Sequence, residues 1–349
     1  MLLRNYWYVA AWSDELSTKP LARMILNEPV ALFRAPDGKA CALQDRCAHR
    51  RMPLSHGRID GDRLICCYHG LAYDFSGRCV RVPGQTEPPR NIRVRSFPTV
   101  ERYGAVWVWM GEPEMADPVR IFNCDEIDPE GAGHKFHFHV KASYLYLNDN
   151  LSDLLHQAYL HNPSFGGNTD PLGETKPVIT QQGDCIDVRW DWANVVVPGT
   201  FGAVGAIVGK ADGWNYSHFE PPCFYINRPG FAAAGTGGIR SERPQGDGKL
   251  SFTVYQLITP ETLRTSHFFK IVRCDWPAEM IPKLPLFIDN VNREDIWACE
   301  EQQRMEDLDA TAPMHAIPTD APVVRMRHIV QRLHAEEQRS QAAPSKVPA

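Results

Sequence analysis

The fold of this chain is decided by residues 47–70, which read CAHRRMPLSHGRIDGDRLICCYHG. The stretch begins with Cys47 and His49, and after sixteen further residues it continues with Cys66 and His69. Two thiolates and two imidazoles on two short loops predict a bound metal centre. Cys67 falls outside this spacing, and we expect it to be a packed thiol.

Two kinds of metal centre use this donor set. A Rieske [2Fe–2S] cluster holds one iron with two cysteines and the other with two histidines. Zinc also binds two cysteines and two histidines, but its usual order places both cysteines before both histidines. The order Cys, His, Cys, His favours the iron–sulfur cluster, and Gly57 and Gly70 are expected to let the backbone approach it closely. The expected ligands are Cys47, His49, Cys66 and His69.

The residues around these loops predict a small all-β domain over residues 1–115. Short strand-like runs alternate with turn signals, such as Pro-Asp-Gly at 36–38 and Ser-Gly at 76–77. No long amphipathic helix is evident in this part of the sequence. The expected strands are 6–11, 22–27, 30–34, 41–44, 71–75, 79–82, 94–101 and 105–110.

A second informative stretch, residues 148–161, reads NDNLSDLLHQAYLH. Ionisable residues in so apolar a segment need a partner or a metal. Two imidazoles and one carboxylate are the ligands of the facial triad in non-haem Fe(II) oxygenases. Two histidines packed inside a buried helix are the alternative.

Spacing limits how this second stretch can bind a metal. His156 and His161 are five residues apart, so on a regular helix they point roughly 140° apart. Both can face one metal only if the helix widens or ends between them, and Asn162-Pro163 favours an end. Asp153 and His156 are three apart and are expected to share a helix face.

Composition narrows the class of protein. The 349 residues suffice for two domains, and 43% hydrophobic content allows a substantial core. The formal net charge of −5 gives no indication of a nucleic-acid surface. Neither a secretory signal nor a membrane span is evident, so a cytoplasmic protein with reduced thiols is expected. Buried, apolar roles are expected for Cys41, Cys79, Cys124, Cys185, Cys223, Cys274 and Cys299.

Taken together, these motifs resemble the Rieske non-haem iron oxygenases, in the branch of the oxygenase components of vanillate O-demethylase, dicamba monooxygenase and toluenesulfonate methyl-monooxygenase. The two cluster loops occur in all Rieske proteins, the second stretch narrows the match to the oxygenases, and flanking runs indicate the branch. The resemblance extends over most of the chain. It includes 4–10 (RNYWYVA), 47–50 (CAHR), 66–71 (CCYHGL), 100–104 (VERYG), 106–109 (VWVW), 149–161 and 259–262 (TPET).

The resemblance implies an α+β protein: an N-terminal all-β Rieske domain (1–115), then an α+β catalytic domain (116–338) with a large antiparallel sheet and helices that carry a mononuclear iron. Residues 339–349 are expected to be a disordered tail. The Gly-rich segment 199–209 is expected to cover or line the pocket. Late helices are expected at 285–305 and 323–337. Expected strands are 178–180, 185–192, 214–220, 223–227, 250–259 and 265–273.

The same resemblance assigns roles near the iron. It makes Asp295 the third ligand beside His156 and His161, with the neighbouring Glu294 pointing elsewhere. Asp153 becomes a relay that hydrogen-bonds the cluster ligand His69 of another subunit in a homotrimer. Asn150 is expected near the iron without binding it.

The branch implies a monooxygenase that uses O₂ and electrons from a flavin/iron–sulfur reductase to attack a methoxy or methyl group of a small aromatic acid. Ring hydroxylation or N-demethylation is the alternative within the family. A Rieske electron carrier without catalytic iron is a more distant one. Asn227, Gln256 and Leu286 are expected to line the pocket. Lys270 stands where relatives tend to have glycine, and it either neutralises an acidic substrate or faces solvent.

Overall fold

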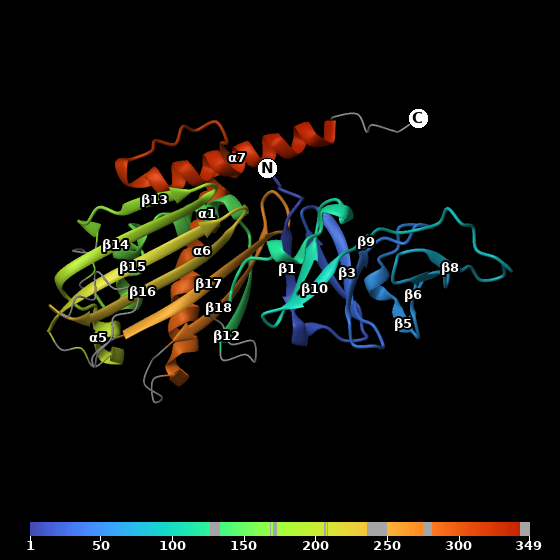
Figure 1. Ribbon diagram of the computed structural model, residues 1–349, viewed down its shortest axis with the longest axis horizontal. Coiled ribbons are helices and arrows are strands. Elements are labelled where there is room, and N and C mark those ends of the chain that lie inside the picture. Colours follow the sequence, from blue (N-terminus) through green and yellow to red (C-terminus); the bar gives the residue numbers. More distant parts are fainter. Residues whose placement is uncertain are drawn as a thin grey trace. The chain divides into compact units, whose positions relative to one another are not determined.

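The computed structural model describes residues 1–125, 133–167, 169, 173–205, 207, 209–235, 250–274 and 281–342. The chain forms two compact units, shown in Figure 1. Unit 1 is Met1–Gly131 with Thr259–Leu263, and unit 2 is Ala132–Ile258 with Arg264–Ala349. The segment Thr259–Leu263 is held to the rest of unit 1 by a hydrogen bond that the Thr259 hydroxyl donates to the carbonyl of Val9 at 2.7 Å. The domain limits at residues 115 and 338 stay predictions.

Unit 1 contains three small antiparallel sheets, ordered β1-β11-β10, β2-β3-β4-β9 and β5-β6-β7-β8. The all-β prediction for this region is therefore confirmed. Its strands are β1 (Trp7–Trp12), β2 (Leu21–Ile25), β3 (Glu28–Arg34), β4 (Ala40–Gln44), β5 (Arg58–Asp60), β6 (Arg63–Ile65), β7 (Ala72–Asp74), β8 (Cys79–Arg81), β9 (Ser96–Phe97), β10 (Thr99–Arg102) and β11 (Ala105–Trp109).

The hairpin of β5 and β6 was not predicted, because half of its strand residues are charged and each strand is only three residues long. It turns at Gly61, whose φ of +59° lies in the left-handed region that favours glycine. The hairpin matters because β6 ends at Ile65, directly before Cys66. Buried Leu54, Leu64 and Tyr73 pack into one core with both cluster cysteines.

Unit 2 is built on a seven-stranded antiparallel sheet, ordered β12-β18-β17-β16-β15-β14-β13. Alternate residues of β14 such as Ile186, Val188 and Trp190 are buried, while those between them are partly exposed, as a sheet with one core face requires. The strands are β12 (His134–Val140), β13 (Val178–Gln182), β14 (Cys185–Val196), β15 (Lys210–Glu220), β16 (Phe224–Ala233), β17 (Leu250–Pro260) and β18 (Ser266–Cys274).

Helices cover the core face of this sheet, and Figure 1 shows α6 running behind the strands. They are α1 (Tyr144–Ser152), α2 (His156–Tyr159), α3 (Asn162–Phe165), α5 (Gly199–Gly205), α6 (Leu284–Leu308) and α7 (Ala321–Ala342). α7 continues through Ala342, so the tail predicted from residue 339 is helical in its first four residues, and the rest of it lies outside the described residues. None of the described helices is long and apolar enough to cross a membrane.

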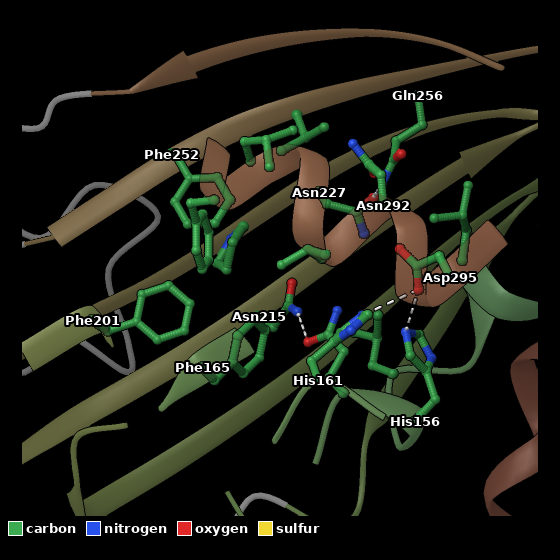
Figure 2. A pocket seen from close by; sticks show the side chains of 18 of the residues that line it. His156, His161, Phe165, Phe201, Asn215, Asn227, Phe252, Gln256, Asn292 and Asp295 are labelled. Atoms are coloured by element: carbon green, nitrogen blue, oxygen red, sulfur yellow. Dashed lines mark hydrogen bonds and ion pairs between the residues drawn. The ribbon is translucent and has the colours of Figure 1, made fainter. Parts of the chain in front are cut away.

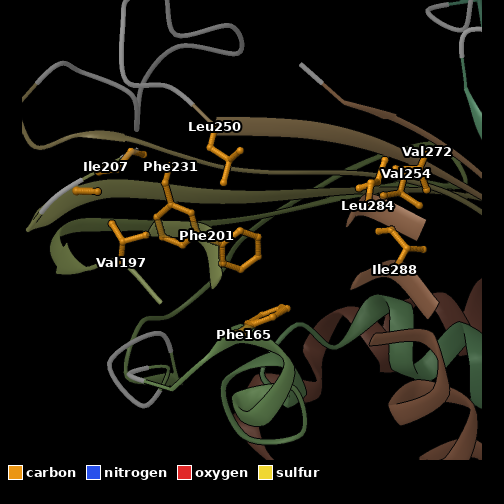
Figure 3. Close-up of a cluster of buried hydrophobic side chains, with 11 residues drawn as sticks. Phe165, Val197, Phe201, Ile207, Phe231, Leu250, Val254, Val272, Leu284 and Ile288 are labelled. Atoms are coloured by element: carbon orange, nitrogen blue, oxygen red, sulfur yellow. The ribbon is translucent and has the colours of Figure 1, made fainter. Parts of the chain in front are cut away.

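Between sheet and helices lies an apolar core that is rich in phenylalanine (Figure 3). Phe201 of α5 packs on Phe165 of α3, with ring centroids 4.9 Å apart, and on Phe231 of β16 at 5.3 Å. Ile288 of α6 joins the same cluster. The Gly-rich segment is therefore tied to the core through α5.

We predict that Gly57 is required for the hairpin that leads to Cys66. A Cβ atom at this position would lie 2.2 Å from the Ile65 carbonyl oxygen, whereas one at Gly61 would meet nothing within 4 Å. Gly57→Ala should therefore destabilise the folded protein by about 3 kcal/mol through steric overlap. The control Gly61→Ala should cost only about 1 kcal/mol, from its left-handed backbone. Calorimetric melting temperatures compare the two, and equal values would contradict the prediction.

Candidate active site

The two loops of unit 1 bring the four predicted cluster ligands together. Cys47 and Cys66 are both 2% exposed and interact through their side chains, while His49 and His69 lie outside them with ring centroids 4.7 Å apart. The Tyr73 hydroxyl lies 3.2 Å from Cys47 Sγ. Buried thiols beneath two exposed imidazoles form a donor set that fits a cluster with one cysteine-bound and one histidine-bound iron.

The other cysteines only partly follow the prediction. All ten are free thiols, and Cys79, Cys124, Cys223 and Cys299 are buried as expected. The prediction that Cys67 is a packed thiol is wrong, because its side chain is exposed. It follows Cys66 in the loop, where adjacent side chains point in different directions. Cys41, Cys185 and Cys274 are only partly buried.

In unit 2, the polypeptide around the two histidines is a broken helix. α1 ends at Ser152, α2 spans only His156–Tyr159, and His161 has φ −90° and ψ 6° just before α3. The predicted end between the histidines is confirmed. The prediction that Asp153 and His156 share a helix face is wrong, because Asp153 has an extended backbone at the break after α1.

This break lets three side chains converge, as Figure 2 shows. Oδ1 of Asp295, on α6, lies 3.4 Å from Nε2 of His156 and 3.1 Å from Nε2 of His161. Two imidazole nitrogens and one carboxylate oxygen on one side of a common point fit a facial iron site that keeps coordination positions open for other ligands.

The other ring nitrogens of both histidines are already occupied. His161 Nδ1 lies 2.7 Å from Glu294 Oε2, and the Ser164 hydroxyl donates to the same carboxylate at 2.7 Å. His156 Nδ1 contacts the backbone carbonyl of Asp153. Such partners fix the tautomer that directs Nε2 at a metal. Glu294 does point away from the triad, as predicted, but its role as a partner of His161 could only be found once α3 and α6 were placed side by side.

The charges of the triad depend strongly on each other. Burial alone would raise the pKa of Asp295, but attraction to His161 and hydrogen bonds with both histidines hold it well below its usual range. Burial would lower the pKa of His161, but Asp295 and Glu294 raise it. The site thus keeps a buried, negatively charged carboxylate, which a divalent cation would stabilise.

Asn150 also touches the triad, as predicted. Its Nδ2 donates to Asp295 Oδ1 at 3.1 Å, and its Oδ1 is buried without a protein partner. Asn150, which lies on α1, therefore helps to orient the Asp295 carboxylate on α6.

The triad lies in the wall of a partly open, mainly apolar cavity. Asn227, Gln256 and Lys270 line it as predicted, which excludes the alternative that Lys270 faces solvent. The prediction for Leu286 is wrong: this residue is 67% exposed, and the next residues of α6, Phe287 and Ile288, line the cavity instead. Aromatic rings make up much of the remaining wall: Phe165, Trp192, Phe201, Trp214, Phe231 and Phe252.

A second group of potential metal ligands lies on β14 and β15, formed by Cys185, His218 and Glu220. His218 already contacts Asp187 at 2.7 Å and Glu220 at 3.4 Å. Neither these three residues nor Asp187 line the cavity described above. The functional centre is therefore better assigned to the group formed by His156, His161 and Asp295.

Comparison with known proteins agrees with both sites. The Rieske [2Fe-2S] domain model matches residues 6–98, and the model of the vanillate O-demethylase oxygenase C-terminal domain matches residues 140–336. The chain belongs to the vanillate O-demethylase family of Rieske oxygenases. As in dicamba monooxygenase, this family member combines a Rieske [2Fe–2S] domain with a mononuclear non-haem iron site.

Individual relatives cover nearly the whole chain. The toluene-4-sulfonate monooxygenase system iron-sulfur subunit of Comamonas testosteroni is 35% identical over 95% of this chain and 97% of its own. The vanillate O-demethylase oxygenase subunit of Pseudomonas sp. (strain HR199 / DSM 7063) is 33% identical, over 97% of this chain and 96% of that subunit. The crystal structure of dicamba monooxygenase bound to dicamba superposes on this chain with a TM-score of 0.82. The two are 30% identical, and the match covers 96% of this chain and 98% of the other.

We predict that Glu294 is needed to hold the mononuclear iron, although it does not face the triad. Glu294→Ala removes the acceptor that orients His161 and should weaken Fe(II) affinity about 10- to 100-fold. Glu301→Ala, at a partly exposed position of the same helix that pairs with Arg304, is the matched control and should leave the Fe(II) affinity unchanged. Fe(II) titration of the metal-depleted proteins measures this, and unchanged affinity in Glu294→Ala would refute the assigned role.

Proposed function

We propose that this chain is the terminal oxygenase of a system that hydroxylates a methoxy or methyl carbon of a small aromatic acid. The observation that carries the proposal is the placement of His156, His161 and Asp295 at the wall of an aromatic-lined cavity. For a methoxy substrate the balance is ArOCH₃ + O₂ + 2e⁻ + 2H⁺ → ArOCH₂OH + H₂O. The hemiacetal then collapses to a phenol and formaldehyde.

Bound iron would supply the oxygen-activating redox chemistry, with electrons delivered through the [2Fe–2S] cluster from a flavin/iron–sulfur reductase. The residues assigned to it are His156, His161 and Asp295, and those assigned to the cluster are Cys47, His49, Cys66 and His69. The chain's remaining task is to position the substrate and keep bulk water away from it.

The cavity is suited to that positioning. Phe165, Phe201 and Phe252 offer ring faces and edges to a flat aromatic compound (Figure 2). Asn215, held by a 2.8 Å hydrogen bond to Gln157, is a polar group in the same wall. A mainly apolar pocket with a few fixed polar groups binds a small aromatic molecule in one orientation.

We further propose that Asp153 serves as the relay between the two centres, by bonding His69 of a neighbouring copy in a homotrimer. Two contacts support a link to the iron ligand: the Asp153 carbonyl bonds His156 Nδ1, and its carboxylate accepts from the Leu155 N–H at 2.8 Å. Burial raises the pKa of this carboxyl group, despite the opposing effect of His156. Asp153 is thus a partly buried ionisable group in contact with His156.

The proposed reaction is tested with a panel of methoxybenzoates and aryl sulfonates, a generic reductase and O₂. We expect formaldehyde and the matching phenol in equal amounts from at least one methoxybenzoate. Asp295→Ala should lower iron from about three to about two atoms per chain and abolish the product. Ring-hydroxylated product without formaldehyde would instead support the ring-hydroxylase alternative.

The relay is tested with Asp153→Asn, which keeps an oxygen for the Leu155 N–H and leaves the backbone carbonyl in place. We expect both iron centres to remain and the reductase to reduce the cluster normally, while formaldehyde formation falls by about 100-fold or more. Normal turnover of this variant would remove Asp153 from the relay. Loss of iron would show that its role is structural.

A further inference from the structure

The cavity contains a buried cation. Lys270, in the middle of β18, is 4% exposed, and its Nζ lies 4.3 Å from the ring centroid of Phe268. The ammonium group donates a hydrogen bond to Oδ1 of Asn292 on α6. Among the described residues, no carboxylate lies within ion-pair distance of it. A buried ammonium without a counter-ion is costly, so a ligand that brings negative charge would be favoured.

Neighbouring amides are also incompletely satisfied. Asn292 is 1% exposed and its Nδ2 has no hydrogen-bond partner. Gln256 donates to Asn227 at 2.7 Å, while its own Oε1 has no partner. If both amides rotate by 180°, their mutual hydrogen bond persists and the Gln256 amide nitrogen becomes the unpartnered group instead. Figure 2 shows Asn227, Gln256 and Asn292 gathered on one side of the triad.

Asp295 does not remove this excess of positive charge. It lies one helical turn after Asn292 and attracts Lys270, but the two form no ion pair. If Asp295 binds a divalent iron, its negative charge would be shared with the metal. The nearby Cys299 thiol is kept neutral, because burial raises its pKa. Glu294 is bonded to His161 and Ser164. This side of the cavity therefore favours an anion.

We propose that Lys270 binds the acid group of the substrate as its counter-ion, with Asn292 and Gln256 as additional hydrogen-bond partners. The enzyme would then select aromatic carboxylates or sulfonates over neutral aromatics of the same shape. This assignment rests on the proposed function for its substrate class. It adds a specificity-determining residue and the location of the anionic end. The phenylalanine-rich wall holds the ring, and the ammonium group fixes its orientation.

The test measures binding separately from turnover. Isothermal titration calorimetry with the iron-loaded protein compares benzoate and benzenesulfonate with neutral benzamide. Lys270→Met removes the charge at nearly constant volume, and we expect about 100-fold weaker binding of both anions with less than about 3-fold change for benzamide. Lys210→Met, at an exposed position of β15 in the same sheet, is the matched control, and it should bind all three compounds with the affinity of the native chain.

A second variant separates charge from hydrogen bonding. Lys270→Gln retains a donor for Asn292 without the charge, so it should lose anion binding to about the same degree as Lys270→Met. Both variants should keep about three irons per chain. Native affinity for benzoate in either variant, equal losses for benzoate and benzamide, or no anion binding by the native chain would overturn the assignment.

Turnover distinguishes this proposal from the proposed function. With a methoxybenzoate that the native chain demethylates, Lys270→Met should lower kcat/KM about 100-fold, whereas the corresponding methoxybenzamide should be unaffected. If the native chain binds anions through Lys270 but releases no formaldehyde, the reaction proposal fails and the anion site stands. If acids and amides are demethylated equally well by both proteins, the anion site fails and the reaction stands.

Discussion

One buried carboxylate, that of Asp295, is the group on which the iron site depends. Its Oδ1 atom lies within 3.4 Å of an imidazole nitrogen from each of two histidines, and the residue is 5% exposed. Such a charge is stable inside a protein only when cations or hydrogen-bond donors surround it. His156, His161 and Asn150 surround Asp295 in this way, and a divalent metal would bind between the two imidazoles and the Asp295 carboxylate.

Several features of the fold keep these groups convergent. The chain breaks its helix twice between residues 152 and 162, which turns His156 and His161 toward one point. Before the break, Asp149 of α1 forms a two-point ion pair with Arg327 of α7, at 2.7 and 2.5 Å, and this contact fixes the position of α1. After it, Phe165 anchors α3 in the aromatic core. The two histidines thus lie on or beside short helical segments held by neighbours at both ends.

The sheet of unit 2 also places a charged side chain in the cavity wall. On β18, Lys270 and Val272 point to one face of the sheet because strand residues alternate in direction. Val272 contributes to the apolar core on this face, so Lys270 is buried beside it.

The sequence by itself predicted the four cluster ligands, because ligand chemistry resides in the side chains and the loop spacings of Cys47, His49, Cys66 and His69 are local. It also predicted the helix end between His156 and His161, since Asn162-Pro163 acts over a few residues. Only the tertiary structure decided which surface each side chain faces. It exposed Cys67 and Leu286, joined Glu294 to His161 across 133 residues of sequence, and buried Lys270 in the cavity, because burial and contact depend on which segments pack together.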